Sequence, residues 1–334
     1  MKGTHVIAAV LTCTACASTA AAQAPERVRP RQQELREQRA TSSAEAQSNA
    51  QAQKEAVAQG RGRAARGQRG GQAEANETFT RIVHLERGAT FDLQNVVGDI
   101  TITGGSGREG KIEVFKRVRA FTNGRAQQVL PQIKVEIAER GGNVEVRTMH
   151  PMGLRGPGEA RVDYVVTLPT NTNLTLRSSS GNLLVQNMSG DELNVDTLQG
   201  NVTVSDLQSR MLELHTVMGD MLLRNIAAQR AIVQSMRGNL EYAGPLQRTG
   251  RYRLQAHNGN IRFIPSGAPG FDLEAMTYSG DLRSDFALTM LQQPPTPRRP
   301  NAQKILRGKF GDASAMVTVS TFGGNIVILK PEAP

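Results

Sequence analysis

The sequence predicts an all-β protein: a parallel β-solenoid (β-helix) with coils of 19–21 residues, preceded by an antiparallel β cap and a disordered N-terminal arm. Three observations lead to this prediction. A Gly-Asn or Gly-Asp pair recurs at a nearly fixed interval through the second half of the chain. Apolar residues alternate with polar ones in phase with these pairs. Large apolar residues are nearly absent between Gln23 and Phe79.

The repeated pair defines the length of a coil. Consecutive glycines of the pairs are 19 residues apart three times, then 21 twice, and then 44. Gly, Asn and Asp adopt positive φ most cheaply, so each pair predicts a turn between strands. In a stack of coils the Asn side chains are expected to form a ladder. The predicted structural turns are Gly181-Asn182, Gly200-Asn201, Gly219-Asp220, Gly238-Asn239, Gly259-Asn260, Gly280-Asp281 and Gly324-Asn325.

Each coil holds two short strands. Leu212, Leu214 and Thr216 precede Gly219 at every second position, and Met221 and Leu223 follow it in the same way. This period of two is typical of a strand with one buried face. A helical repeat would place apolar residues at i, i+3 and i+4, which these coils do not. The sequence therefore predicts strands with one face turned inward, in residues 176–330.

The first 22 residues have the features of a secretory signal peptide. A short apolar run, Val6–Leu11, follows Lys2, and Ala20-Ala21-Ala22 predicts cleavage after Ala22. The run is too short to span a membrane. Lipidation at Cys16 is the alternative, disfavoured because another Cys stands where a lipoprotein signal has Leu. We expect an exported protein of the periplasm, the cell surface or the extracellular space.

Residues 23–78 are rich in Ala, Gln and Arg, so we expect a disordered arm that cannot bury a core. Its run Arg61–Gly71 resembles the Arg-Gly segments of RNA-binding proteins. The export signal argues against a nucleic-acid partner. A solvated linker, or an arm that touches anionic envelope polymers, is the preferred interpretation.

Residues 79–175 predict an antiparallel β cap over the first coil. Strands alternate cleanly at Lys111–Val118 and Ile133–Ile137, but their spacing is irregular. A solenoid needs such a cap because a bare end coil is an open sheet edge. One Gly-Asp-apolar signature, at Gly98, also lies here. Within the solenoid an insertion is expected near 286–304, where prolines between 294 and 300 predict an exposed loop.

Several of these segments resemble the DUF4097 family of bacterial envelope proteins, whose members are often labelled adhesins. The resemblance lies in Val166–Pro169, Leu174-Thr175-Leu176, Ser179–Leu183, the serial Gly-Asn/Asp-apolar repeats, and Thr321–Ile328, which is similar to the family's last coil. It covers roughly Phe79 to Lys330. The resemblance implies a parallel β-solenoid in or beyond the envelope and brings no catalytic residues with it.

We find no pattern that calls for a metal or a cofactor. The histidines at 84, 150, 215 and 257 lack zinc spacing, and no Cys-x-x-Cys is present. Aspartates that follow Gly are interpreted as turn caps, because the nonapeptide of calcium-binding β-rolls is missing. Outward Asp196, Asp206 and Glu213 suggest the alternative of a polysaccharide-active β-helix enzyme, which would need two carboxylates about 5–9 Å apart. Solvated polar residues are the simpler explanation, so we predict no enzyme.

The net charge of +10 favours anionic partners. Six arginines of the middle coils form the predicted anionic-ligand face: Arg224, Arg230, Arg237, Arg251, Arg253 and Arg262. Solubility alone would explain the same charge. We predict a non-catalytic envelope or secreted protein with an adhesin-like or scaffold role, and with anionic envelope polymers, glycans or other envelope proteins as partners. A role in envelope-stress signalling is an alternative that only the resemblance implies.

Overall fold

The computed structural model describes residues 73–150, 159–267, 270–290 and 303–331. The predicted signal peptide, Cys16, the arm up to residue 72 and the proline-rich loop lie outside the described residues. The described chain is all-β, as predicted, apart from helix α2 (Asn123–Val129) and the short 3-10 helix η1 (Leu130–Gln132). None of the described helices is long and apolar enough to cross a membrane.

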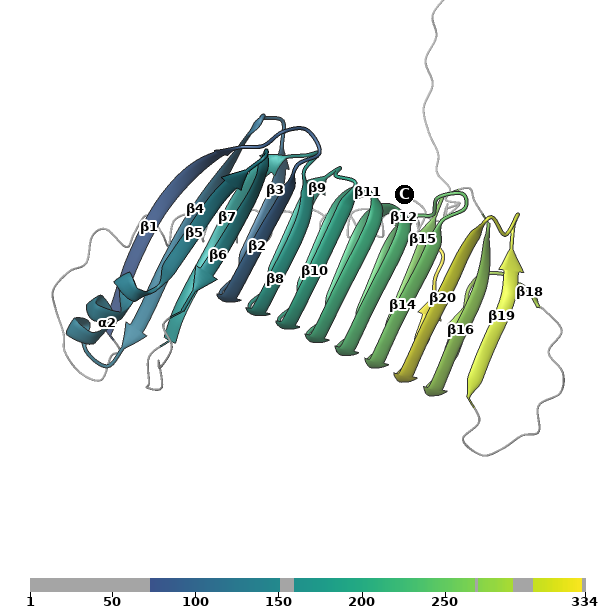
Figure 1. Cartoon of the computed structure of the whole chain (residues 1–334). Helices are drawn as coiled ribbons and strands as arrows, with labels where there is room; N and C mark the ends of the chain where they lie inside the picture. Colours follow the sequence, from purple (N-terminus) through teal and green to yellow (C-terminus); the bar gives the residue numbers. More distant parts are fainter. Residues whose placement is uncertain (1–72, 151–158, 268–269, 291–302, 332–334) are drawn as a thin grey trace, which may run out of the picture. The chain divides into compact units, whose positions relative to one another are not determined.

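The strands pair mainly in parallel, as Figure 1 shows for a long row of neighbouring arrows. Leu193 pairs with Leu212, and Leu212 with Ala231, so neighbouring strands are offset by 19 residues. The same inward positions therefore stack on one another. The strands of this parallel stack before the last coils are β8 (Asn173–Ser180), β9 (Leu183–Met188), β10 (Glu192–Gln199), β11 (Val202–Met218), β12 (Met221–Arg237), β13 (Leu240–Pro245), β14 (Arg251–Asn258) and β15 (Ile261–Ser266).

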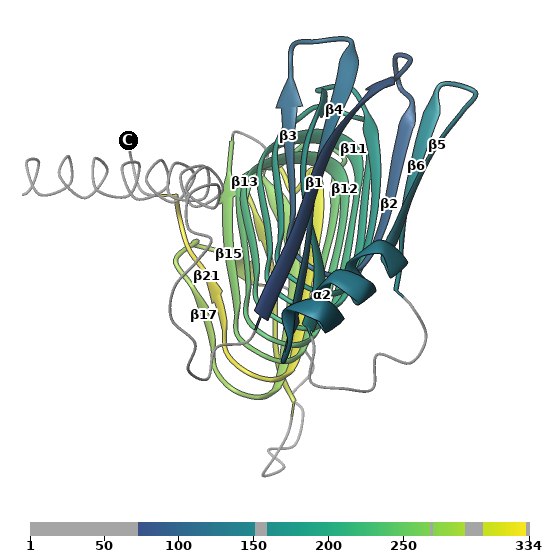
Figure 2. The ribbon, with the colours of Figure 1, turned by 90° about the vertical axis from the view of Figure 1, so that its left-hand side faces the viewer.

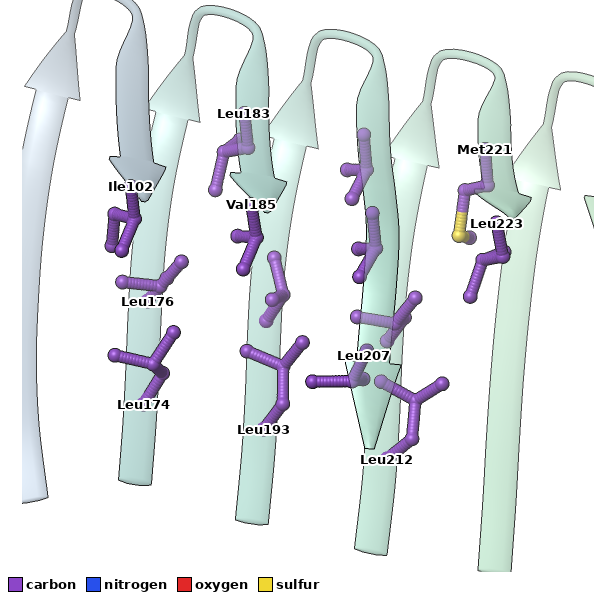
Figure 3. Close-up of a cluster of buried hydrophobic side chains, with 14 of the residues drawn as sticks. Ile102, Leu174, Leu176, Leu183, Val185, Leu193, Leu207, Leu212, Met221 and Leu223 are labelled. Atoms are coloured by element: carbon purple, nitrogen blue, oxygen red, sulfur yellow. The ribbon is translucent and has the colours of Figure 1, made fainter. Parts of the chain in front are cut away.

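The core lies between the two strands of each coil. Seen along the stack, the chain turns back on itself in each coil around this interior (Figure 2). Leu174, Leu193 and Leu212 point into it from successive strands, and Val185 meets them from the other side (Figure 3). All four are at most 1% exposed, which accounts for the alternation of apolar and polar residues in the sequence.

The predicted turns form a ladder. In each step the backbone N–H of one Asn or Asp donates to the side-chain oxygen of the corresponding residue in the neighbouring coil, over 2.7–3.1 Å. In spatial order the ladder runs through Asp163, Asp99, Asn182, Asn201, Asp220, Asn239, Asn260, Asn325 and Asp281. The side chains of the first eight residues, from Asp163 to Asn325, thus each satisfy a backbone donor that the strands leave unpaired.

A cation stands at each end of the ladder. Arg161 forms ion pairs with Asp99 and Asp163 at one end. At the other end Lys304 Nζ lies 2.8 Å from Asp281 Oδ1, and its hydrogen bond and charge lower the pKa of that carboxyl. The turn glycines pack tightly against the turn of the neighbouring coil. A Cβ on Gly200 would lie 2.0 Å from the Gly181 carbonyl oxygen. No larger residue fits there without a shift of the backbone.

The strands of the N-terminal region differ from the predicted domain boundaries. Residues 73–78, predicted as the end of the disordered arm, are part of strand β1. Strands β2 (Thr90–Val97) and β3 (Ile100–Gly105), predicted as part of the antiparallel cap, pair in parallel with β8 and β9. The Gly-Asp signature at Gly98 therefore marks a full member of the stack. The antiparallel part consists of three strand pairs: β1 with β4, β4 with β7, and β5 with β6. The bounds of these strands are β1 Ala73–His84, β4 Glu109–Ala120, β5 Lys134–Arg140, β6 Asn143–Met149 and β7 Glu159–Pro169.

The last coils do not stack in the order of the sequence. Strand β20 (Ala315–Gly323) pairs in parallel with β14 on one side and with β16 (Phe271–Ser279) on the other. The coil of Gly324 therefore lies between the coils of Gly259 and Gly280 (Figure 1). Thr321–Ile328, which is similar to the family's last coil, therefore does not lie at the end of the stack. Strand β19 (Lys304–Phe310) instead pairs antiparallel with the outer edge of β16. The remaining strands are β17 (Leu282–Ser284), β18 (Thr289–Met290) and β21 (Ile326–Ile328).

Buried tyrosines make the stability of this fold sensitive to high pH. Burial raises the pKa of the Tyr164 hydroxyl from 10.0 to about 12, although its hydrogen bond with Thr148 acts to lower that pKa. The unfolded chain would lose this proton near pH 10, so the stability from neutral Tyr164 is complete below that pH and is lost as the pH rises towards about 12. We expect Tyr164→Phe to flatten the fall of the melting temperature above pH 10. Circular dichroism would measure this. The same change at the half-exposed Tyr278 should leave the profile as it is, and equal profiles for all three proteins would contradict the assignment.

Candidate binding groove along the turn edge of the stack

A groove of about 980 Å³ runs across the coils, next to the turn ladder. It is lined by Thr148 and by residues two to four positions before the turn glycine in eight coils. The fourth position before the glycine supplies a polar row in six coils, with Ser320 and Met276 in the other two: Gln94, Arg177, Asp196, His215, Gln234 and Gln255. The second position supplies an apolar row in six coils, with Ser179 and His257 in the other two: Val96, Leu198, Val217, Met236, Phe322 and Tyr278. We use the names groove, polar row and apolar row for these sets.

The backbone explains why the apolar row faces outward. Between β10 and β11, Thr197 pairs with Thr216 and Gln199 with Met218, whereas Leu198 and Val217 between them do not pair. The alternation of the strand continues to Leu198, which points outward like Asp196, and it ends at Gln199 next to the turn. Leu198 is consequently 58% exposed and Met236 53%. Leu198, Val217 and Met236 come from three successive coils, and an exposed apolar run of this kind on a folded domain is a feature of interaction sites.

Three rings continue the row at its C-terminal end. The His257 and Phe322 rings stack with centroids 5.1 Å apart and an interplanar angle of 11°. The Phe322 and Tyr278 rings lie 5.3 Å apart. Phe322 stands between the other two because β20 is inserted between β14 and β16. Since the ring faces turn toward one another, they present mainly their edges to a ligand.

The polar row carries donors and acceptors of different kinds. Arg177 lies 3.5 Å from Asp92, and Gln234 Nε2 donates to Gln255 Oε1 over 3.1 Å. His215 Nε2 is 3.0 Å from a carboxylate oxygen of Glu213. Asp196 has no ion pair among the described residues. The row therefore offers Arg as a donor, Asp as an acceptor, and Gln as both.

Hydroxyl groups lie between the two rows. Ser178, Thr197, Thr216 and Ser235 line the groove at the third position before the glycine, and each is at most 5% exposed. Within the described residues these four hydroxyls have no hydrogen-bond partner. In the last coils the equivalent Thr321 donates to the Gly259 carbonyl over 3.0 Å.

The six predicted arginines do not form one face. Arg224 and Arg262 lie on strands that follow a turn, and Arg237 stands next to its turn glycine. Only Arg230, Arg251 and Arg253 come together, because Arg230 pairs in register with Arg251 and Arg253 is two residues further along β14. We call these three the Arg cluster. All three are exposed, and within the described residues no acidic side chain pairs with them. The cluster shares its outer surface with Gln255 of the polar row, since both lie at alternate positions of β14.

The fold and the turn ladder agree with a known family. The family model of DUF4097, named Toastrack, matches residues 83–329. The chain belongs to the DUF4097 family. This confirms the resemblance drawn from the repeats and agrees with the extent, Phe79 to Lys330, over which it was expected.

Solved structures similar to this DUF4097 protein are distant in sequence. A putative adhesin from Bacteroides fragilis is 14% identical with a TM-score of 0.40, over 76% of this chain and 97% of that one. A putative cell adhesion protein from Clostridium sporogenes is 13% identical with a TM-score of 0.38, over 77% and 100%. A putative lipid binding protein from Parabacteroides distasonis is 11% identical with a TM-score of 0.30, over 75% and 96%. The comparison with curated proteins gave no match.

Of the carboxylates considered for catalysis, Asp206 lies apart from Asp196 and Glu213, which are on neighbouring strands of this DUF4097 fold. Asp196 and His215 are adjacent in register, as expected from the strand spacing. Glu213 contacts His215, whereas Asp206 lies at the second bend of its coil with φ of 54° and accepts a hydrogen bond from Asn225. In the part of the chain that the structure describes, no three His, Cys, Asp or Glu side chains are grouped so as to hold a metal ion.

The sequence prediction missed the apolar row. Its signal was present, since Leu198, Val217 and Met236 each stand two residues before a turn glycine, where strict alternation would place an outward polar residue. The repeat made this departure from the pattern visible. The sequence alone could not show that Leu198 and Val217, at this position, are not paired with each other between neighbouring strands.

Proposed function

We propose that this DUF4097 protein is an exported, non-catalytic binding module, with an adhesin-like or scaffold role at the bacterial envelope. The observation that carries the proposal is the Arg cluster: three exposed arginines on neighbouring coils without an acidic partner among the described residues. Guanidinium groups held side by side suit phosphate, carboxylate or sulfate groups of an anionic polymer. The signal-like N-terminus of the sequence supports export.

We interpret the stack as a parallel β-solenoid. The in-register offsets of 19 and 21 residues, as for Ala231 with Leu212 and with Tyr252, support this interpretation. A solenoid presents long outer surfaces with few concave pockets, and such surfaces suit extended polymers and other proteins. The Arg cluster would attach one of these surfaces to an anionic envelope component.

Two variants of equal charge test the role of the Arg cluster. Replacing Arg230, Arg251 and Arg253 by Gln lowers the net charge from +10 to +7, and so does replacing the scattered Arg224, Arg237 and Arg262. We expect the first variant to bind lipopolysaccharide or acidic glycans about three- to tenfold more weakly at low salt, because each of the three exposed ion pairs contributes about 0.2–0.5 kcal/mol. The second variant should bind nearly as the parent does.

Retention of the full chain on envelope fractions, in low and high salt, is the measurement. Binding that salt abolishes and that only the first variant loses would support the proposal. An equal loss in both variants would mean that net charge acts without a site. Absence of retention on every fraction would overturn the role for anionic polymers.

A further inference from the structure

We propose that the groove is a binding site for a neutral, linear polysaccharide. The inference deepens the proposed role as a binding module by naming a ligand class. It uses different residues from the Arg cluster, so either can fail alone. It rests on the two rows that line the groove and on the periodicity with which they repeat.

The groove repeats with the period of the stack. One segment of its lining comes from each of eight coils, and strands in a sheet lie about 4.8 Å apart. A ligand that runs along the groove therefore meets a polar and an apolar side chain in five of the eight coils, while Ser179, His257 and Met276 interrupt the pattern in the other three. A linear polymer whose units each have a polar and an apolar side matches this pattern, and sugar units joined in an extended chain have both.

The polar row favours hydroxyl groups over other ligands. Arg177 only donates, Asp196 only accepts, and Gln234 does both, so a ligand group must serve either role. A hydroxyl does. An acyl chain would bury these side chains without partners, which is costly. A peptide would find no free strand edge, because Thr197, Thr216 and Ser235 already pair with one another in the sheet.

The apolar row and the charges define the ligand further. Leu198, Met236 and the edges of the Phe322 and Tyr278 rings offer contact to the C–H surfaces of sugar units. Arg177 already pairs with Asp92, while Asp196 has no cation partner among the described residues. An anionic chain would gain little from the first and be repelled by the second. The groove therefore fits an uncharged glycan.

Titration calorimetry of the full chain with soluble neutral oligosaccharides tests the inference. The probes are linear β-linked and α-linked glucose oligomers of increasing length, in high salt. The chain has no Trp, so heat is a better signal than intrinsic fluorescence. We expect affinity to rise with oligomer length for one of the two linkages and to survive high salt, because no ion pair is involved.

Matched double variants locate the site. Replacing Gln234 and Gln255 by Ala should weaken binding about tenfold or more, because two hydrogen-bonding side chains are lost. Replacing Gln208 and Gln229, which are exposed in neighbouring coils outside the groove, should leave the affinity unchanged. The variant of the Arg cluster should also bind the neutral oligomers like the parent.

Three results would overturn the inference. One is that the protein binds palmitate or an extended peptide and binds none of the neutral oligomers. Another is a glycan affinity that falls equally in both Gln variants. The third is binding confined to acidic glycans and lost with the Arg cluster, which would support the proposed function while removing the groove from it.

Discussion

Replacing Leu214 by Asp is expected to unfold the middle coils of this DUF4097 protein. Leu214 is fully buried and stacks between Val195 and Val233 of the neighbouring coils. An Asp there has no partner, so it must be buried as a charge or take up a proton, and the packing of Leu is lost as well. We expect a loss of about 4 kcal/mol or more in the free energy of unfolding. Urea unfolding followed by circular dichroism would measure this.

The matched control is Ile232→Asp. Ile232 pairs in register with Glu213, is partly exposed, and points outward from the next coil. The same type of change there should cost within about 1 kcal/mol. Hydrogen exchange would show whether the loss in the Leu214 variant is confined to its neighbouring coils, as expected when each coil contacts only the next. Unchanged melting of Leu214→Asp would refute the inward register of β11.

Ending the chain at Ala313 is expected to open the stack near its C-terminal end. The truncation removes β20 and β21, and with them Val317, Val319, Ile326 and Ile328, which are fully buried. Strands β14 and β16 would then both lose a parallel partner. At about 1.5–3 kcal/mol for each large apolar side chain, the loss is about 5 kcal/mol or more. Thermal unfolding of the two chains would measure it.

The control for the truncation ends the chain at Lys330, after β21, and should melt like the parent. A peptide of residues 314–330, added to the shorter chain, should restore stability because it supplies the missing strand between two open edges. A truncated chain of parental stability would show that β16 pairs directly with β14. That is the order that the sequence spacing had suggested.

The Arg cluster shows how far site prediction from sequence could go. Six arginines of the middle coils are evident from the sequence, but spacing alone does not say which of them share a surface. Arg230 and Arg251 are 21 residues apart and become neighbours through the strand register, while Arg262 lies on another strand, 3.6 Å from Glu241. Grouping them required the positions of the two strands in each coil.

The sequence by itself determined the all-β class, the turn pairs and the inward positions, because these depend on local properties. A Gly-Asn pair favours a turn through its own backbone freedom, and alternation at Leu212 and Leu214 indicates a buried strand face without knowledge of its neighbours.

The tertiary structure alone decided which coil lies next to which. Residues 271–284 and 315–328 have the same pattern, so either could stack on the coil of Gly259. The choice is made by contacts distant in sequence: β19 pairs antiparallel with the outer edge of β16, which leaves β20 the place between β14 and β16. That order brings His257, Phe322 and Tyr278 together at the end of the groove, a contact that no periodicity in the sequence encodes.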